Sequence, residues 1–241
     1  MARQKRQEVH TALRRPKAWP FYIICDVSRS MWDPRFHDGN QHTPWHVMRD
    51  GLADLVFAVE ESPTASDICH LGVIAFADTV TEVLPLTSFR GSAMSIGALP
   101  QGSYTDYAQL FHDLAGILDR DLSRLATTHD SKPPAIFFIT DGEATGPDGE
   151  LQPDDVWKAQ LSRVHGRVPQ PDIVTLGLGE ARESALVTIR AGRGPACLAD
   201  LSANPGDLLK SIIDSIVKSV LASTTQESFW FDVPASMKRL A

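Results

Sequence analysis

The sequence predicts an α/β fold, with a doubly wound, mostly parallel six-stranded sheet, one antiparallel edge strand and helices on both faces. Two short apolar runs, 21–26 and 135–141, each end on an acid, as strands buried on both faces often do. Segments with helical spacing separate such runs, which predicts crossover helices between parallel strands. Only residues 77–79 separate two other apolar runs, and so short a turn indicates an antiparallel edge pair.

Two of the six predicted strands end in an aspartate. The strands at 21–26 and 135–141 end in Asp26 and Asp141, and the run 68–76 pairs with 80–86 across the tight turn. The segments 172–177 and 196–199 supply the last two strands. Because ligands bind such sheets beyond the carboxyl ends of the strands, where the strand order reverses, we expect Asp26 and Asp141 to share one crevice.

Five segments have the periodicity of amphipathic helices. They are 44–61, 105–118, 154–164, 183–191 and 205–221, with Thr105 as the expected N-cap of the second. After the last helix, Phe229, Trp230 and Phe231 could pack on the body or face a partner, and we favour packing because large aromatic side chains are usually covered.

The charge is divided unevenly along the chain. Of the formal net charge of −7, residues 1–17 contribute six Lys or Arg against Glu8 alone, so the remainder carries −12. We expect a basic, flexible arm at 1–17, one domain at 18–222 and a tail at 223–241. A basic arm can touch nucleic acid or an anionic membrane, but a solvated tail is commoner. The acidic body argues against a nucleic-acid-binding face.

Membrane and export signals are missing from the sequence. No stretch approaches the roughly 18 apolar residues of a membrane span, and no apolar signal region follows the basic start, so we expect a cytoplasmic protein. The three cysteines, Cys25, Cys69 and Cys197, lie far apart in apolar runs. They are interpreted as buried thiols in a reducing compartment.

The loop after the first strand carries alternating oxygen-bearing side chains, Asp26, Ser28 and Ser30. Hydroxyl and carboxylate oxygens suit a hard cation rather than a soft one. Mg²⁺ prefers octahedral oxygen coordination and keeps several waters, and Mn²⁺ would fit the same ligands. The loop therefore predicts a divalent-cation site with an open position.

The chain resembles the von Willebrand factor type A (VWA) family, whose fold is Rossmann-like. The motif Asp26-x-Ser28-x-Ser30, the pair Thr105-Asp106 opening a helix, and Thr140-Asp141-Gly142 after an apolar strand occur in the family's order, and they resemble its metal-ion-dependent adhesion site (MIDAS). The resemblance, over about residues 18–222, implies that a metal is coordinated by the hydroxyls of Ser28, Ser30 and Thr105. It implies that Asp26 and Asp141 hold the metal directly or through water. It also implies that a partner's carboxylate fills the open position.

Two assignments at this site have alternatives. Ser103, two residues before Thr105, could supply the oxygen instead, although Thr105 fits the family pattern better. The rim after the first loop, Trp32, Asp33, Arg35, Phe36 and His37, has the composition of an interface hot spot, but Trp32 and Phe36 could equally staple the loop to the body. With Glu143 as a rim acid, we expect Trp32, Arg35, Phe36 and Glu143 to meet a partner.

Enzymatic motifs are weak or missing. The segment 177–182 only partly matches a dinucleotide-binding turn because Arg182 replaces its last glycine, and His42 and His46 lack a third ligand at metal-binding spacing. A metal-dependent hydrolase, with water activated beside Asp141 and Glu143, is the surviving enzyme alternative, and a purely structural metal is another. We expect no enzymatic activity.

Within the family, the chain resembles the bacterial intracellular members, because no signal sequence is recognised in it. These include proteins associated with stress response and tellurite resistance, such as the TerY group, which are thought to act as adaptors. Other intracellular members are partner subunits of AAA-type ATPases, and the residues do not choose between the two. The expected partner is therefore a protein that supplies a carboxylate, with no nucleic acid or membrane partner for the main domain.

Overall fold

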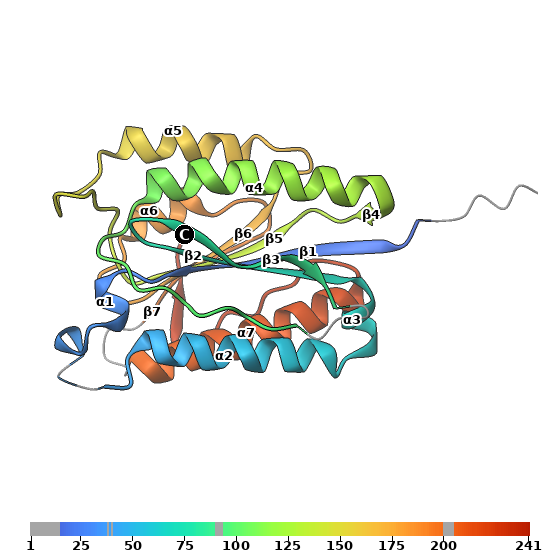
Figure 1. Ribbon diagram of the computed structural model, residues 1–241, viewed down its shortest axis with the longest axis horizontal. Helices are drawn as coiled ribbons and strands as arrows, with labels where there is room; N and C mark the ends of the chain where they lie inside the picture. The colour runs from blue at the N-terminus through green and yellow to red at the C-terminus, as the bar shows by residue number, and fades with distance from the viewer. Residues whose placement is uncertain (1–14, 38, 40, 90–93, 200–204) are drawn as a thin grey trace, which may run out of the picture.

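The computed structural model describes residues 15–37, 39, 41–89, 94–199 and 205–241. A central sheet lies between two layers of helices (Figure 1). Its strand order is β3-β2-β1-β5-β6-β7-β8, with the short β4 paired to β1 outside this path. The predicted doubly wound, mostly parallel sheet with helices on both faces is confirmed.

The strands at the centre of the sheet are parallel and buried. β1 (Lys17–Asp26) pairs with β2 (Cys69–Phe76) on one side and β5 (Ala135–Thr140) on the other, and β6 (Asp172–Gly177) and β7 (Ala196–Ala199) continue from β5. Every residue of β5 and β6 is buried. Burying each Ile or Val side chain here contributes roughly 1.5–3 kcal/mol relative to leaving it exposed.

Both edge strands are antiparallel, one more than we predicted. β3 (Val80–Ser88) pairs with β2 as expected, and β8 (Met237–Arg239) pairs with β7 at the other edge. The two-residue β4 (Asp130–Ser131) brings the sheet to eight strands rather than six. Both extra strands were missed because segments of two or three polar-rich residues show no alternation.

One face of the sheet is covered by α2 (Pro44–Glu60), α3 (Pro63–Ile68) and α7 (Pro205–Gln226) (Figure 1). Their apolar side chains join the core formed by the same face of β1, β2 and β5. A Cβ atom added to Gly51 of α2 would lie 2.2 Å from Ile213 Cδ1 of α7. The missing side chain therefore allows these two helices to approach closely.

The opposite face is covered by α4 (Tyr107–Thr128), α5 (Asp154–His165) and α6 (Glu183–Ile189) (Figure 1). The aromatic rings of this second core pack mostly edge to face, with ring centroids 5.5–6.2 Å apart; they belong to Tyr107, Phe111, Phe138 and Trp157. The 22-residue α4 extends ten residues past the predicted end at 118. These two layers hold the strands whose carboxyl ends form the candidate site.

Secondary structure continues across one of the expected domain bounds. The boundary expected after residue 222 falls within α7, and the segment that follows contributes β8. Phe229 and Phe231 pack on Phe137 at centroid distances of 6.5 and 5.9 Å, as predicted, while Trp230 stays partly exposed. Of the predicted basic arm, residues 1–14 lie outside the described residues.

Two further features concern the interior and the membrane. Cys25, Cys69 and Cys197 are buried free thiols, as the sequence predicts, and burial raises the pKa of Cys197 to about 11. Within the described parts of the chain, no helix is both long enough and apolar enough to cross a bilayer.

Candidate functional site

The carboxyl end of β1 places Asp26 at the centre of the site. Asp26 is fully buried, and its two oxygens have separate partners. Oδ1 accepts a 2.9 Å hydrogen bond from the Ser28 N–H, and Oδ2 accepts one of 2.7 Å from the Thr140 hydroxyl of β5. Burial raises the pKa of the Asp26 carboxyl above its usual range, although these hydrogen bonds act in the opposite direction.

The loop after β1 presents two hydroxyls beside Asp26. It leads directly into the short helix α1 (Arg29–Trp32), of which Ser28 is the N-cap, yet the Ser28 side chain makes no capping hydrogen bond. Its hydroxyl lies 3.3 Å from the Ser30 hydroxyl instead. The Ser28 oxygen is therefore turned away from the role that serine usually has at a helix start and toward the site.

Asp141 enters the site from the end of β5, the neighbour of β1. Its Oδ1 accepts a 2.8 Å hydrogen bond from the Ser30 hydroxyl. Although the residue is partly exposed, protein atoms surround its carboxyl group, and this burial, together with the negative charge of Asp26, raises the pKa of Asp141 to about 8. The two carboxyl groups are so close that ionisation of one disfavours ionisation of the other.

Thr105 lies against the same strand end from a third segment. A Cβ atom added to Gly142 would lie 3.6 Å from the Thr105 hydroxyl oxygen, so the hydroxyl faces the turn that follows Asp141. The Thr105 backbone is held by two hydrogen bonds to Thr145. Its N–H donates to Thr145 Oγ1 at 2.9 Å, and its carbonyl accepts from the Thr145 N–H at 2.8 Å. Ser103, the alternative ligand, is exposed, and its backbone N–H binds Asp78.

The predicted N-cap at Thr105 is wrong by one residue. Helix α4 begins at Tyr107, and its N-cap is Asp106, whose carboxylate accepts a 2.8 Å hydrogen bond from the Gln109 N–H. A carboxylate at this position also interacts favourably with the positive end of the helix dipole. The Thr105 hydroxyl is consequently not needed for capping.

Three supporting residues were not among the predicted site residues. Besides binding Asp26, the buried Thr140 hydroxyl lies 3.3 Å from the Tyr107 hydroxyl and accepts from the Gly142 N–H at the same distance. Tyr107 also donates to the Gly142 carbonyl at 3.2 Å, and Thr145 holds Thr105. The only sequence signal was Thr140 in the Thr-Asp-Gly motif, because a tyrosine on an apolar helix face resembles an ordinary core residue.

The first side of the rim is built on α1 and the 3₁₀ helix η1 (Pro34–Phe36). Trp32 is half-buried and donates from its indole nitrogen to the Gly102 carbonyl at 2.9 Å, whereas Phe36 is 60% exposed. Arg35 forms several hydrogen bonds with Asp33 and holds the pKa of that carboxyl at about 2. The staple interpretation therefore fits Trp32, and an open contact surface fits Phe36.

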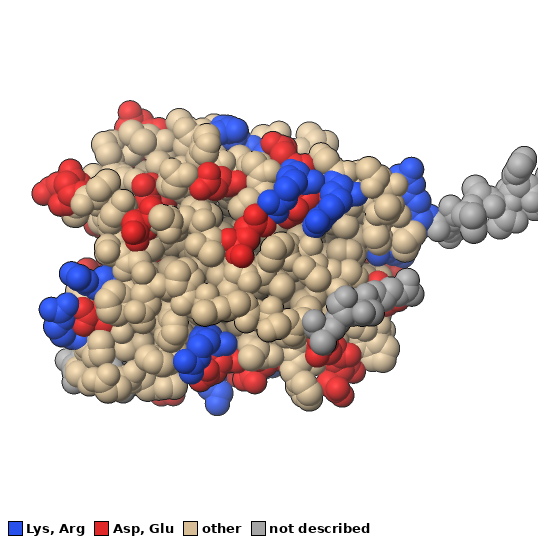
Figure 2. Space-filling view, in the orientation of Figure 1, with Lys and Arg blue, Asp and Glu red and all other residues tan. Residues whose placement is uncertain are grey.

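The second side of the rim is acidic, whereas the first side carries exposed arginine. Glu143 lies 3.9 Å from the Arg182 guanidinium, and the loop beyond it exposes Asp148 and Glu150. Figure 2 shows Lys and Arg side chains over the α1 end of the molecule and acidic side chains at the tip of the loop before α5. A ligand at the site would thus meet a basic side and an acidic side.

The side chains that converge here offer oxygen atoms only. Among the described residues, no three His, Cys, Asp or Glu side chains gather around one point, since this set has two carboxylates and is completed by hydroxyls. The imidazole rings of His42 and His46 stack on each other with their centroids 5.8 Å apart, and His46 completes the capping box of α2. Hard divalent cations prefer such oxygen ligands.

The chain was compared with known proteins at the level of sequence and of structure. A family model described as von Willebrand factor type A domain matches residues 21–143, just over half of the chain. Among curated proteins, none matches. Many solved structures are similar, at low sequence identity.

Three of these structures illustrate the likeness. A von Willebrand factor type A protein from Catenulispora acidiphila has a TM-score of 0.55 at 17% identity, over 86% of this chain and 43% of that one. Proximal thread matrix protein 1 from the mussel byssus, solved with a zinc-occupied MIDAS motif, has a TM-score of 0.51 at 18% identity, over 86% of this chain and 46% of that one. The PilB minor pilin from Streptococcus sanguinis has a TM-score of 0.56 at 10% identity, over 88% of this chain and 63% of that one.

The chain spans less than two thirds of each of these three structures, and the low identity shows a shared fold. The family match is independent of that likeness and runs from the middle of β1 to the turn after β5. It includes the loop of Ser28 and Ser30, the Thr105 segment and Asp141. This chain belongs to the von Willebrand factor type A domain family.

Proposed function

We propose that the chain is a protein-interaction module that binds an acidic group of a partner through a divalent cation, Mg²⁺ or Mn²⁺. The cation would be held by five side chains that provide only oxygen atoms: Asp26, Ser28, Ser30, Thr105 and Asp141. A bound cation would supply a Lewis-acidic position for a partner's carboxylate. The resemblance to the MIDAS motif, which holds zinc in the byssus protein, agrees with this proposal.

The observation that carries the proposal is the convergence of hydroxyls and carboxylates from separate segments. The Ser28 and Ser30 hydroxyls are 3.3 Å apart, and Ser30 lies 2.8 Å from Asp141 across 111 positions of sequence. Two ionised carboxylates would balance the double charge of the cation, and a buried charge is stable only when it is compensated. The donor set therefore fits a hard dication.

The residues of the chain would divide the work. Asp26, fixed by Thr140 and by the Ser28 N–H, would hold the cation through its carboxylate, directly or through water. The hydroxyls would contribute neutral ligands, and the open position would take the partner's carboxylate. Phe36, exposed at the rim, would add apolar contact with the partner.

Metal binding is tested by isothermal titration calorimetry with MgCl₂ and MnCl₂. Ser30→Ala should weaken binding at least about tenfold, the usual order for loss of a group that ligates or positions a metal. Ser103→Ala is the matched control, because it removes the alternative hydroxyl, and its affinity should equal that of the wild type. Equal affinities for the wild type and Ser30→Ala would contradict the proposed site.

Partner binding is tested by affinity capture in Mg²⁺ and in EDTA, with the wild type and Asp26→Ala side by side. Circular dichroism must first show that Asp26→Ala is folded, since Asp26 is buried and hydrogen-bonded. A partner retained only by the wild type in Mg²⁺ supports the proposal. A partner retained equally under all four conditions excludes the cation as the bridge.

We also propose that the site binds rather than catalyses. The acid best placed to serve as a base, Glu143, lies 3.9 Å from the Arg182 guanidinium, which would compete with a catalytic water for its carboxylate. Mg²⁺-dependent hydrolysis of a phosphate or peptide ester that disappears in Asp26→Ala would establish the hydrolase alternative instead.

For the biological setting, we propose a bacterial cytoplasmic adaptor of the stress-response or tellurite-resistance type. Support comes from the sequence resemblance and from three buried free cysteines, which suit a reducing compartment. Subcellular fractionation of the source cells tests the location. Co-purification with an AAA-type ATPase would favour the other intracellular group.

A further inference from the structure

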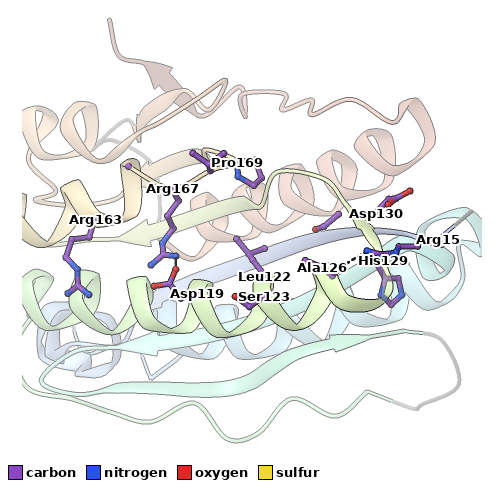
Figure 3. Close-up of a pocket in the computed structure, with 13 residues that line it drawn as sticks. Arg15, Asp119, Leu122, Ser123, Ala126, His129, Asp130, Arg163, Arg167 and Pro169 are labelled. Atoms are coloured by element: carbon purple, nitrogen blue, oxygen red, sulfur yellow. Dashed lines mark hydrogen bonds and ion pairs between the residues drawn. The ribbon is translucent and has the colours of Figure 1, made fainter.

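A second surface lies at the other end of the sheet from the candidate metal site. Here β1 and β6 begin, α4 ends and α5 has just finished, and these elements surround a cavity of about 840 Å³. We call it the amino-end groove, and its main lining residues are Arg15, Asp119, Leu122, Ala126, Arg163 and Val168. Figure 3 shows side chains of the groove on α4, on α5 and the segment that follows it, and on the segment before β1.

One end of the groove is basic and partly neutralised. Arg167 pairs with Asp119 of α4 and also donates to the Ala115 carbonyl, so its charge is engaged. Arg163 is exposed, with its Nη1 3.2 Å from His112 Nδ1 and 3.3 Å from Gln160 Oε1, and its charge helps to lower the pKa of the Asp119 carboxyl. Within the described part of the chain, Arg163 has no salt bridge, which leaves its guanidinium available to a ligand.

The other end carries a second available guanidinium. Arg15 donates to the Ala126 carbonyl at 2.8 Å, which fixes it at the far end of α4, and among the described residues it forms no salt bridge. His129 and Asp130 lie beside it (Figure 3). The groove as a whole has three arginines against two aspartates, in a protein whose formal net charge is −7. This local excess of positive charge is opposite in sign to the molecule.

Between the two ends the lining is apolar. Leu122 and Ala126 share one face of α4 with Asp119, and Pro169 lies across from them (Figure 3). Val168, the residue before Pro169, also lines the groove. The Val168 side chain is 95% exposed, the highest value among the large apolar residues described. A small inorganic anion would leave these apolar groups uncovered, whereas an aliphatic side chain would bury them.

We propose that the amino-end groove binds an extended, acidic segment of a partner protein that carries aliphatic side chains between two acids. The Arg163 guanidinium lies beside His112 and that of Arg15 lies beside Ala126, and these two helix positions are fourteen residues apart, about 21 Å at 1.5 Å per residue. An extended peptide advances about 3.3 Å per residue, so acids roughly six positions apart would reach Arg163 and Arg15 together. Aliphatic side chains between the two acids would meet Leu122 and Val168.

This groove extends the proposed function without depending on it. The metal site would take one acidic partner at the carboxyl ends of the strands, and the groove would take another at their amino ends. An adaptor needs two such surfaces that can be occupied together. Because the groove uses guanidinium and apolar contacts, its binding is independent of divalent cations.

Fluorescence anisotropy with a labelled peptide, Gly-Ser-Glu-Ala-Leu-Val-Ala-Ser-Asp-Ser-Gly, tests the groove on the full chain in EDTA. A peptide with Gln and Asn in place of the two acids, and one with Gly-Gly in place of Leu-Val, are the matched probes. The acidic aliphatic peptide should bind at least about tenfold more tightly than either, and added salt should weaken it.

Two exposed positions of the groove provide the variants. Arg163→Glu and Val168→Asp should each weaken binding about tenfold or more, because each introduces a negative charge facing an acid. Lys238→Glu, the same charge reversal at an exposed position of β8, is the control and should stay within about twofold of the wild type. Neither substituted groove side chain is buried, so all three proteins should fold.

Several results would overturn the proposal. The acidic and neutral peptides could bind with equal affinity, or Lys238→Glu could weaken binding as much as Arg163→Glu does. Inorganic phosphate or an oligothymidylate could also compete more strongly than unlabelled peptide. Self-association of the protein that is lost in Arg163→Glu would assign the groove to contact between copies instead. Peptide binding that requires Mg²⁺ or is lost in Ser30→Ala would place it at the metal site, so the two proposals can fail separately.

Discussion

The Ser30 hydroxyl donates a 2.8 Å hydrogen bond to Asp141 Oδ1, joining the loop after β1 to the end of β5. Both strands lie side by side at the centre of the sheet, with Cys25 opposite Ile139. A hydroxyl that donates to a carboxylate still has lone pairs with which to bind a cation. The bond therefore orders the two loops while leaving both groups able to act as ligands.

The crowding of Asp141 and Asp26 predicts an unusual pH dependence for the metal-free protein. The pKa of Asp141 is about 8 in the folded state against 3.8 for an ordinary aspartate. Between these values the folded state binds more protons than the unfolded state, so the free energy of unfolding should fall as pH rises from about 4 to about 8, by at most about 1.4 kcal/mol per pH unit for one group. Urea denaturation in EDTA across this range measures it.

The control for this dependence is Asp141→Asn, which removes the titrating group and should flatten the profile. Mg²⁺ should restore stability at the higher pH, because a cation favours the ionised carboxylates of the folded state. A wild-type protein that becomes steadily more stable from about pH 4 to about pH 8 in EDTA would contradict the prediction.

Thr140→Val should lower both stability and metal affinity. The change deprives Asp26 Oδ2 of its 2.7 Å hydrogen bond inside the core, which should cost roughly 1–3 kcal/mol and loosen the carboxylate. Thr175→Val is the matched control, since Thr175 is equally buried and its hydroxyl binds only the Leu186 carbonyl at 3.0 Å. Mg²⁺ affinity should fall roughly tenfold in Thr140→Val and stay unchanged in Thr175→Val; equal affinities would remove the positioning role of Thr140.

The central sheet could be predicted because its strands are apolar runs bounded by turns. The same reasoning stopped helix α4 at Leu118, although it continues to Thr128. Asp121 interrupts the apolar pattern there, yet it is fully buried, where it accepts from the Tyr22 hydroxyl at 3.1 Å and from Arg120 at 2.9 Å. A buried acid satisfied by distant partners cannot be recognised from local periodicity.

The candidate site was predictable where it depends on strand ends. Asp26 and Asp141 follow adjacent parallel strands, so their meeting follows from topology, and the hydroxyls of Ser28 and Ser30 come with the loop. The support from Tyr107 was not visible, because its contact with Thr140 depends on how α4 packs. Cation binding at these residues stays a prediction.

Trp32 and Phe36 should separate the two interpretations of the rim. Trp32→Ala removes the hydrogen bond to the Gly102 carbonyl and half-buried ring contacts, so it should lower the free energy of unfolding by roughly 1–3 kcal/mol. Phe36→Ala changes an exposed ring and should stay within about 0.5 kcal/mol of the wild type. Chemical denaturation measures both, and similar losses in the two variants would show that Phe36 also fastens the loop.

Two helical glycines should respond oppositely to alanine. Gly116 of α4 has nothing within 4 Å of an added Cβ, so Gly116→Ala should stabilise the protein by roughly 0.5–1 kcal/mol through lower backbone entropy in the unfolded chain. At Gly51 of α2 the added Cβ would lie 2.2 Å from Ile213 Cδ1 and 2.9 Å from its Cγ2. Because Ile213 is buried, it cannot swing into solvent, and Gly51→Ala should destabilise by roughly 1–3 kcal/mol as α2 and α7 are forced apart. Thermal and urea denaturation of the two variants measure the difference, and a stabilised Gly51→Ala would mean that the α2–α7 contact is looser than these distances require.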